Sequence, residues 1–442
     1  MVVLGMGRDG AGASSGGGAR PRRISIHGPP ERGHGRTVPA TEPRRRRSLA
    51  RVPTRYDVDR DALAGFLAGE PSYRVDQVWD GLYRQLASPA DLTTLPRSLR
   101  TRLDRELPAA LEAAAESIDA SGATVKWLFR LDGGARIETV LMHYRDRTTV
   151  CVSTQAGCAM ACGFCATGQA GFQRHLTTGE IVEQIVRAAG RARDDGRRLG
   201  NVVFMGMGEP LANYERVWPA VERAHGALGL SARHLTLSTV GLVPGIRRLA
   251  TEDLPVNLAV SLHAANDGLR DELVPINRRY PLSVLVGACA DYVRAKGRRL
   301  SFEWALIDGT NDRRSDARQL ADLASSLPLP AHVNLIPLNP TPGYPTRGTP
   351  PDGVRRFRGW LRDLGVNATV RRNRGADIDA ACGQLAARAA VGADNPSRAA
   401  VGADNPSRAA VGADNPSRAA VGASNPSRVA VGAAESVTAP AR

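Results

Sequence analysis

Lysine is nearly absent from this chain of 442 residues, although the chain is strongly basic. Only Lys126 and Lys296 are lysines among its 59 basic side chains; the rest are arginines. This bias is more typical of a GC-rich genome than of a binding chemistry. The net charge is +15, but 12 arginines against three acids fall within residues 1–55. The charge therefore favours an acidic partner such as nucleic acid only moderately.

Long apolar runs are also absent. No stretch approaches the roughly 20 apolar residues that a helix needs to cross a bilayer, and residues 1–10 lack the apolar core of a signal peptide. Cysteine is scarce, and four of the six cysteines lie between positions 151 and 165. Such grouping fits a reducing compartment better than a disulfide framework. We therefore expect a cytoplasmic protein without a membrane segment.

Both ends of the chain have compositions that cannot bury a core. Residues 1–55 are rich in Gly, Pro, Ser and Arg, which predicts a disordered basic arm, with RNA attraction as an alternative role. Residues 389–442 begin with four copies of Ala-Ala-Val-Gly-Ala-Asp-Asn-Pro-Ser-Arg, and Ser424 replaces Asp in the last copy. We predict a disordered repeat tail without a catalytic role; the alternative is a partner-binding tail.

The region between the arm and the cysteines divides into two parts. Apolar residues at helical spacing predict a small helical domain over residues 56–117. Its arginines are solvated or contact RNA phosphates. Residues 118–150 alternate as strands do and predict a β-hairpin that leads into the core.

Strands and helices alternate from position 150 onward, which predicts an α/β core over residues 151–388. The expected strands are 150–153, 202–205, 234–238, 256–262, 300–307 and 332–336. The expected helices are 178–193, with Thr178 as its cap, and 214–228, 282–295, 314–327 and 352–364. This order predicts a parallel sheet curved into a partial TIM-type barrel, whose chemistry lies at the carboxyl ends of the strands.

Three cysteines with the spacing Cys-x3-Cys-x2-Cys follow the first of these strands. The thiolates of Cys158, Cys162 and Cys165 can hold three irons of a [4Fe–4S] cluster and leave the fourth iron open. An amine and a carboxylate of a small molecule can chelate that open iron. The alternative is structural zinc with Cys151 as a fourth ligand, although zinc sites prefer paired Cys-x2–4-Cys units. The motif resembles that of the radical S-adenosylmethionine (SAM) enzymes, including Phe164 before the last cysteine.

Polar residues end several of the predicted strands. Gly208 and Glu209 lie in a Gly-rich loop, where a carboxylate can accept hydrogen bonds from a ligand ammonium and glycine permits close approach. Ser238, Ser261-Leu262-His263 and Asn339 end or follow other strands. Each could be an ordinary cap or turn residue, but their convergence on one rim favours a ligand site. Cys382 lies in a polar context, whereas Cys289 fits a buried apolar helix.

Together these motifs resemble the RlmN/Cfr family of radical SAM RNA methyltransferases, from about Tyr56 to Leu385. The residues that carry the resemblance are Tyr73-Arg74-Val75-Asp76-Gln77-Val78, Ile137-Glu138-Thr139-Val140, Cys151, the cysteine motif, Gly206–Pro210, Leu237-Ser238-Thr239, Ser261-Leu262-His263, Ile336-Pro337-Leu338-Asn339-Pro340 and Arg374–Leu385. Neither tail is part of the resemblance.

The resemblance implies methylation of carbon 2 of adenosine in 23S rRNA, at the peptidyl-transferase centre, and in tRNA, 3′ of the anticodon. It implies one [4Fe–4S] cluster and two SAM molecules per turnover. It further implies that a methyl group is first placed on Cys382, that Glu138 removes the ring proton, and that Cys151 forms a disulfide with Cys382 that releases the RNA. Without the family, a solvated strand carboxylate would be the simpler interpretation of Glu138.

The resemblance further implies a monomer that receives electrons from a donor such as flavodoxin or ferredoxin. Two alternatives stay open. One is methylation at carbon 8, as in the Cfr branch, and the other is a non-catalytic RNA-binding protein with a cysteine-bound metal.

Overall fold

The structure is a computed structural model that describes residues 52–341 and 343–371. The predictions for most of the basic arm, for Cys382 with the rest of 372–388, and for the repeat tail therefore fall outside the described residues. Within them, no helix combines the length and apolarity needed to cross a membrane.

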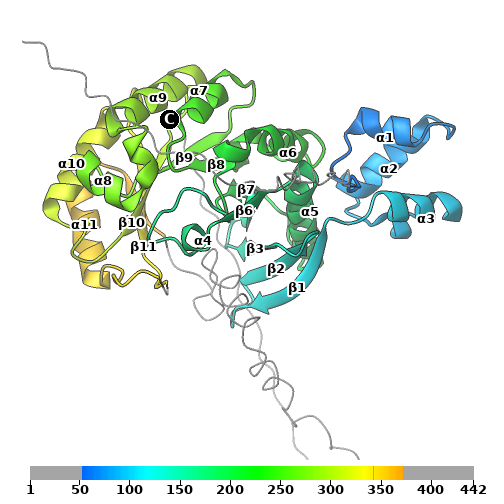
Figure 1. Ribbon diagram of the computed structural model, residues 1–442, viewed down its shortest axis with the longest axis horizontal. Helices are drawn as coiled ribbons and strands as arrows, with labels where there is room; N and C mark the ends of the chain where they lie inside the picture. The colour runs from blue at the N-terminus through cyan, green and yellow to red at the C-terminus, as the bar shows by residue number, and fades with distance from the viewer. Residues whose placement is uncertain (1–51, 342, 372–442) are drawn as a thin grey trace, which may run out of the picture. The chain divides into compact units, whose positions relative to one another are not determined.

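A single ten-stranded sheet forms the centre of the described chain (Figure 1). Its order is β1-β2-β3-β4-β7-β8-β9-β10-β11-β12. The strands are β1 (Leu111–Ile118), β2 (Thr124–Leu131), β3 (Arg136–His143), β4 (Thr148–Cys151), β7 (Asn201–Phe204), β8 (Leu235–Thr239), β9 (Asn257–Ser261), β10 (Ser301–Leu306), β11 (His332–Pro337) and β12 (Ala368–Val370). A separate two-stranded sheet pairs β5 (Gln155–Gly157) with β6 (Phe172–His175).

The sheet changes character at β4. The pairs β1–β2, β2–β3 and β3–β4 are antiparallel. From the pair β4–β7 onward, every pair of neighbouring strands in the sheet is parallel. The described strands end at two open edges, β1 and β12. The predicted α/β fold with a partial, mostly parallel barrel is confirmed, and so is the hairpin of β2 and β3.

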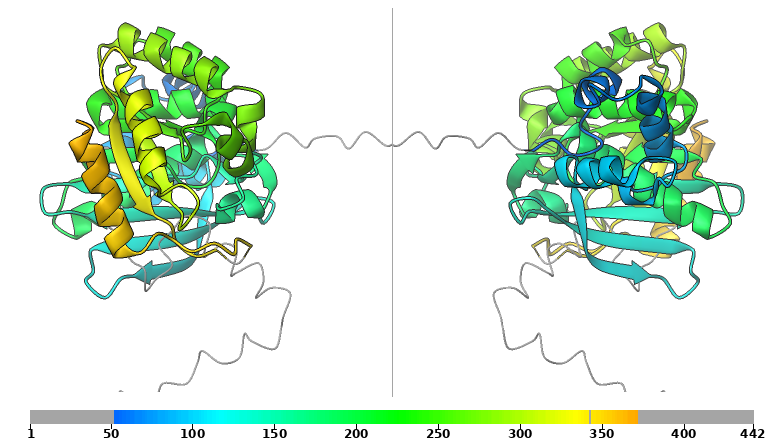
Figure 2. Two further views of the ribbon diagram at one scale, coloured as in Figure 1. Left: turned by 90° about the vertical axis from the view of Figure 1, so that its left-hand side faces the viewer. Right: turned by 90° about the vertical axis from the view of Figure 1, so that its right-hand side faces the viewer.

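Helices connect the parallel strands, as this topology requires. They lie along the outer side of those strands (Figures 1 and 2). The longer ones are α5 (Thr178–Asp194), α6 (Tyr214–Gly226), α7 (Val243–Thr251), α9 (Leu282–Lys296), α10 (Arg314–Ser325) and α11 (Pro351–Asp363). The short helices α4 (Ala166–Gln169) and α8 (Asp267–Leu273) belong to the loops at the strand ends.

The two faces of the sheet bury different side chains because neighbouring residues of a strand point to opposite faces. On the outer face, Val202 and Phe204 of β7 belong to the same buried core as Ile181 and Ile185 of α5. On the inner face, a separate buried group contains Val140 and Met142 of β3 and Cys151 of β4.

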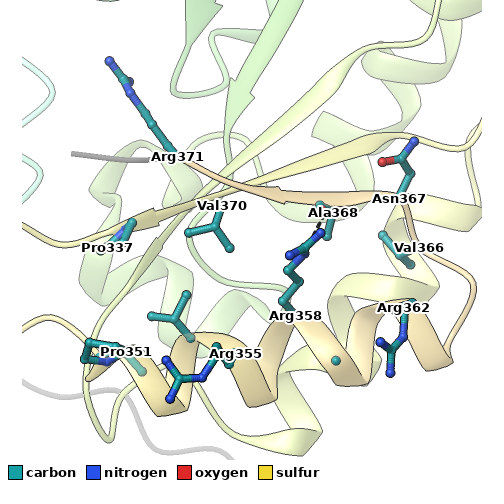
Figure 3. Close-up of a pocket in the computed structure, with 13 residues that line it drawn as sticks. Pro337, Pro351, Arg355, Arg358, Arg362, Val366, Asn367, Ala368, Val370 and Arg371 are labelled. Carbon is teal, nitrogen blue, oxygen red and sulfur yellow. Dashed lines mark hydrogen bonds between the residues drawn. The ribbon is translucent and has the colours of Figure 1, made fainter. Parts of the chain in front are cut away.

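A hollow of about 1120 Å³ lies between α11 and β12 (Figure 3). Arg355, Arg358 and Arg362 of α11 line it together with Val366 and Arg371. Two of these arginines already have acidic partners, because Arg355 pairs with Asp352 and Arg362 with Asp363. Of the predicted catalytic and cofactor residues that the structure describes, none lines this hollow.

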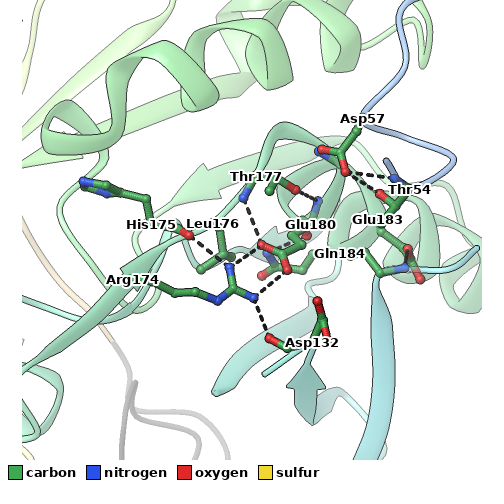
Figure 4. A network of polar contacts seen from close by, with 12 residues as sticks. Thr54, Asp57, Asp132, Arg174, His175, Leu176, Thr177, Glu180, Glu183 and Gln184 are labelled. Atoms are coloured by element: carbon green, nitrogen blue, oxygen red, sulfur yellow. Dashed lines mark hydrogen bonds and ion pairs between the residues drawn. The ribbon is translucent and has the colours of Figure 1, made fainter. Parts of the chain in front are cut away.

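The amino end of α5 is held by the segment that precedes the first helix (Figure 4). Thr177, not the predicted Thr178, caps α5, in a capping box with Glu180. Asp57 Oδ1 accepts a hydrogen bond of 2.7 Å from the backbone N–H of Gly179, and Asp57 Oδ2 accepts one from Thr54 Oγ1. The bonds from Gly179 N–H to Asp57 and from Glu180 N–H to Thr177 Oγ1 satisfy amide groups that a helix start leaves without partners. A carboxylate at this end is also favoured by the helix dipole.

The predicted helical domain of residues 56–117 is helical only as far as Glu106. It contains α1 (Arg60–Phe66), α2 (Tyr73–Tyr83) and α3 (Arg97–Glu106). Residues 111–118 instead form β1, which pairs antiparallel with β2 around a bulge between Ala113 and Ala115. The alanines and glutamates of this stretch favour a helix by propensity, but sheet pairing overrides it.

Candidate active site

The cysteine loop begins where β5 ends. The backbone N–H of Cys158 donates to Gly171 O over 2.9 Å, and β6 pairs with β5, which closes the loop. Gly157 has a φ of +76°, and a Cβ there would lie 1.8 Å from Gly171 O. Only glycine fits this position, so the chain can turn sharply into the motif.

The three motif cysteines line one cavity together with residues from the carboxyl ends of the parallel strands. Strand-end residues that line it are Gly206, Gly208 and Glu209 after β7, Ser238 and Thr239 in β8, Ser261 and His263 at β9, Ile336 in β11 and Arg371 after β12; Glu303, in the middle of β10, lines it as well. The structure thus brings Gly208, Glu209, Ser238, Ser261 and His263 to the same cavity as the cysteines. Leu262 is instead fully buried, and Asn339, two residues beyond β11, is not among the lining residues.

The described residues form no preassembled site for a single metal ion. In the described part of the chain, no three His, Cys, Asp or Glu side chains are placed to hold one ion. Cluster thiolates bind separate irons and need not converge on one point. Cys151 lies in the inner-face group of Val140 and Met142 and does not line the cavity. The geometry therefore gives no support to zinc with Cys151 as a ligand.

Burial raises the pKa of Cys158 to about 11 and also raises that of Cys162. Without metal, both side chains are therefore thiols at neutral pH. Metal binding has to displace their protons.

Glu209 is a buried carboxylate held in place by backbone groups. Its Oε1 accepts from Leu211 N over 3.0 Å and its Oε2 from Val240 N over 2.9 Å. Its own N–H donates to Gln155 Oε1. Burial raises the pKa of Glu209 to about 7. The Thr239 side chain is a third hydrogen-bond partner of this carboxylate. One of the four lone pairs of the carboxylate then remains to accept from an ammonium group.

Gly208 is required by the packing of the protein itself. Its φ is +103°, and a Cβ there would lie 2.5 Å from Gln155 Cβ. The expectation that glycine lets a ligand approach is therefore incomplete, because this glycine first lets the loop after β7 pack against β5.

His263 is held as a neutral donor. Its Nδ1 accepts from the backbone N–H of Ala305 over 3.0 Å, which leaves the proton on Nε2. Burial, together with the charge of Arg270, lowers the pKa of His263 to about 3. The residue has a φ of +60°, which is unusual outside glycine. Its ring meets that of Phe164 edge to face at 4.8 Å.

Sequence reasoning missed Arg270 of α8, which is fully buried. Its guanidinium donates to Val240 O (2.7 Å), Leu262 O (3.1 Å), Ser261 O (3.4 Å) and Asn277 Oδ1 (2.8 Å). Burial lowers its pKa to about 10, so it stays charged at neutral pH. Arg270 thereby ties together the loops that follow β8 and β9.

Glu303 was also missed, although it lines the cavity. It accepts from Asn334 Nδ2 over 2.7 Å and from Ser301 Oγ over 3.0 Å, and burial raises its pKa. The signal in the sequence was weak: two polar residues at alternate positions, Ser301 and Glu303, in an otherwise apolar strand.

Glu138 is not solvated, contrary to the simpler interpretation of the sequence. Its side chain is 2% exposed, and Oε2 lies 3.0 Å from Nζ of Lys126, which is fully buried. Ser153 Oγ donates to the backbone oxygen of Glu138 over 2.6 Å, which places this residue of β3 beside the carboxyl end of β4. Cys289 is fully buried, as predicted.

Comparison with known proteins gives consistent results. A model of the Radical SAM superfamily matches residues 152–323. The probable dual-specificity RNA methyltransferase RlmN of Chloroflexus aurantiacus is 51% identical over 352 residues, which cover 76% of this chain and 93% of that protein. The dual-specificity RNA methyltransferase RlmN 1 of Myxococcus xanthus is 51% identical over 338 residues, 75% of this chain and 94% of that protein. A crystal structure of a radical SAM methyltransferase from Sphaerobacter thermophilus matches with a TM-score of 0.73 and 51% identity, and covers 75% of this chain and 98% of that one.

Proposed function

Because the chain belongs to the RlmN family of radical SAM RNA methyltransferases, we propose that it methylates carbon 2 of adenosine in RNA. The substrates are 23S rRNA, at the peptidyl-transferase centre, and tRNA, at the adenosine 3′ of the anticodon. One observation supports this most: three thiols share a cavity with a carboxylate, two serines and a neutral histidine from successive strand ends.

The lining residues fit the two cofactors by their chemistry. Cys158, Cys162 and Cys165 would hold one [4Fe–4S] cluster. Glu209 would accept from the SAM ammonium and His263 would donate from Nε2. The remaining SAM contacts are assigned to Gly208, Ser238, Ser261, the backbone of Leu262, and Asn339. When bound, the cluster supplies the electron that cleaves SAM, so that a hydrogen atom can be taken from the methyl group on Cys382.

Three residues of the chain complete the transfer. Cys382 first accepts a methyl group from one SAM molecule, and the carbon of that group later bonds to carbon 2 of adenine. Glu138 accepts the ring proton. Cys151 then attacks the sulfur of Cys382, and the resulting disulfide releases the methylated RNA. An electron donor such as flavodoxin or ferredoxin provides the electrons that reduce the disulfide back to two thiols and the electron that reduces the cluster. The enzyme works as a monomer in the cytoplasm.

The target adenosine has to leave its stack to reach the cavity. Unpaired RNA loops permit this at the lowest cost. The helices α1 to α3 are assigned to RNA binding, because their arginines can meet phosphates. Methylation at carbon 8 uses the same catalytic parts, so mass spectrometry of the product nucleoside has to distinguish the two positions.

Cys151→Ala tests this function most directly. The variant retains the methyl carrier and the cysteine motif but lacks the thiol that resolves the intermediate. We expect protein joined covalently to RNA through Cys382, seen as a shifted band on a denaturing gel that nuclease reduces to a small mass increment. Cys382→Ala should form no adduct and no product.

Normal multiple turnover by Cys151→Ala would contradict the roles of both cysteines. A non-catalytic metal protein predicts no SAM cleavage after anaerobic cluster reconstitution. It also predicts loss of metal in Cys151→Ala if that residue is a ligand.

A further inference from the structure

Lys126 is an exception in the sequence and in the structure. It is one of two lysines in a chain that otherwise uses arginine. It lies in the middle of β2 and is fully buried, with Nζ at 3.0 Å from Oε2 of Glu138. Its ammonium group is therefore directed to a carboxylate inside the protein and not to RNA phosphates at the surface.

Stability does not explain this pair well. Burying two charges has a desolvation cost that their attraction often fails to recover, and apolar replacements of similar volume are often as stable or more so. The inner-face neighbours Val140, Met142 and Cys151 form a mostly apolar group that would accept such replacements. A buried ion pair at this position therefore calls for a functional reason.

The register of the sheet places the pair beside the thiol chemistry. Lys126 lies directly opposite Val140, and Val140 lies directly opposite Cys151, so the three share one face. Glu138 is two residues from Val140 on β3, on the same face and toward the carboxyl end of β4. The cysteine loop follows that end of the strand. Glu138 is thus nearer to the reaction edge than Lys126.

We infer that Lys126 is a positioning residue for Glu138, the proton acceptor of the proposed function, on which this inference rests. The ammonium, 3.0 Å away, fixes where the carboxylate oxygen lies. The ring proton moves to Glu138, and no bond to Lys126 forms or breaks. Lysine suits this task because its compact ammonium is a point charge, whereas the planar fork of arginine needs more space.

The experiment compares Lys126→Met, Lys126→Arg, Glu138→Gln and the double variant Lys126→Met/Glu138→Gln in the reconstituted full-length enzyme. Four quantities are measured: iron and sulfide content, methylation of Cys382, the rate of carbon-2 methylation, and covalent protein–RNA adduct. Lys296→Met is the matched control, because Lys296 is the last residue of α9 and contacts a backbone oxygen, that of Glu252, instead of a buried carboxylate.

We expect Lys126→Met to retain its cluster and methylated Cys382 but to methylate carbon 2 about 10- to 100-fold more slowly, as a misplaced catalytic group does. The adduct should accumulate, because the ring proton is removed slowly. Lys126→Arg should recover part of the rate. Glu138→Gln should lose about 10²- to 10⁴-fold. The double variant should be no slower than Glu138→Gln, since Lys126 acts only through that carboxylate.

Normal turnover by Lys126→Met would overturn the inference. If Lys126→Met loses its cluster, the double variant distinguishes a positioning role from a structural one, because it removes both charges of the buried pair. A double variant with an intact cluster and the rate of Glu138→Gln supports the positioning role. A double variant that also loses its cluster shows a structural role instead. Normal turnover by Glu138→Gln would refute the proton-acceptor assignment in the proposed function, which is a separate failure.

Discussion

Replacing Arg270 with methionine should lower the free energy of unfolding by about 3–5 kcal/mol. Three of its hydrogen bonds are 3.1 Å or shorter, to Val240 O, Leu262 O and Asn277 Oδ1. An acceptor left buried without a partner costs about 1–3 kcal/mol, and removing the guanidinium returns part of its own desolvation cost. Methionine fills a similar volume, so the change measures the lost polar contacts more than a cavity.

Urea denaturation of the purified protein, followed by circular dichroism, measures this difference. Arg294→Met is the matched control, because Arg294 pairs with Asp291 on the exposed side of α9. An exposed pair contributes less than about 1 kcal/mol. Arg270→Lys keeps the charge but has fewer donors, so its stability should lie between the other two. SAM affinity should fall in Arg270→Met, because the loops after β8 and β9 lose their shared partner.

A stability of Arg270→Met within about 1 kcal/mol of the parent would refute this reasoning. It would mean that water or nearby side chains replace the guanidinium without cost. The two loops would then be held by the sheet alone.

Three further predictions concern other parts of the chain. Cys162→Ala should lose the cluster, because one iron then has no protein thiolate, whereas Cys289→Ala should keep its full iron and sulfide content by chemical analysis. Asp57→Asn should lower stability by about 1–2 kcal/mol at pH 7. Burial alone would raise the pKa of Asp57, but its hydrogen bonds hold that pKa below the ordinary 3.8. The difference in unfolding free energy between Asp57→Asn and the parent, measured by urea titration, should therefore shrink as the pH falls below 3.8. Deleting 1–50 and 389–442 should leave methylation of a short RNA intact and slow RNA encounter only at low salt; a folded, cluster-loaded truncation that is inactive at every salt would contradict this.

Sequence patterns located the parallel half of the fold well. The predicted helix at 178–193 is α5 (Thr178–Asp194), and the predicted strand at 332–336 is β11 (His332–Pro337). Long periodic segments with clear capping residues carry their own structural signal. The three-residue strand β12 (Ala368–Val370) is too short to show an alternation of apolar and polar residues, so the sequence did not predict it. Strand β1 was mistaken for a helix because its partner strand, and not its own composition, decides its structure.

The candidate site was predictable where the sequence motif and the strand end coincide, as at Glu209 and Ser238. It was not predictable at Arg270, Glu303 or Lys126. A charged residue in a sequence is solvated by default, and only tertiary packing decides that it is buried with partners. For Lys126 one signal did exist, namely a lysine at a position where this chain would be expected to use arginine.

The order of strands in the sheet also has a consequence for how the chain is made. β1 to β4 are neighbours both in the chain and in the sheet, so they can pair as soon as they leave the ribosome. The other edge of β4 waits for β7, which follows only after the cysteine loop and α5. At about 5–20 residues per second, that edge stays unpaired for several seconds of synthesis. We expect the nascent chain to be most vulnerable to wrong strand pairing in this interval. Protease sensitivity of ribosome-bound chains that end before and after β7 would measure it.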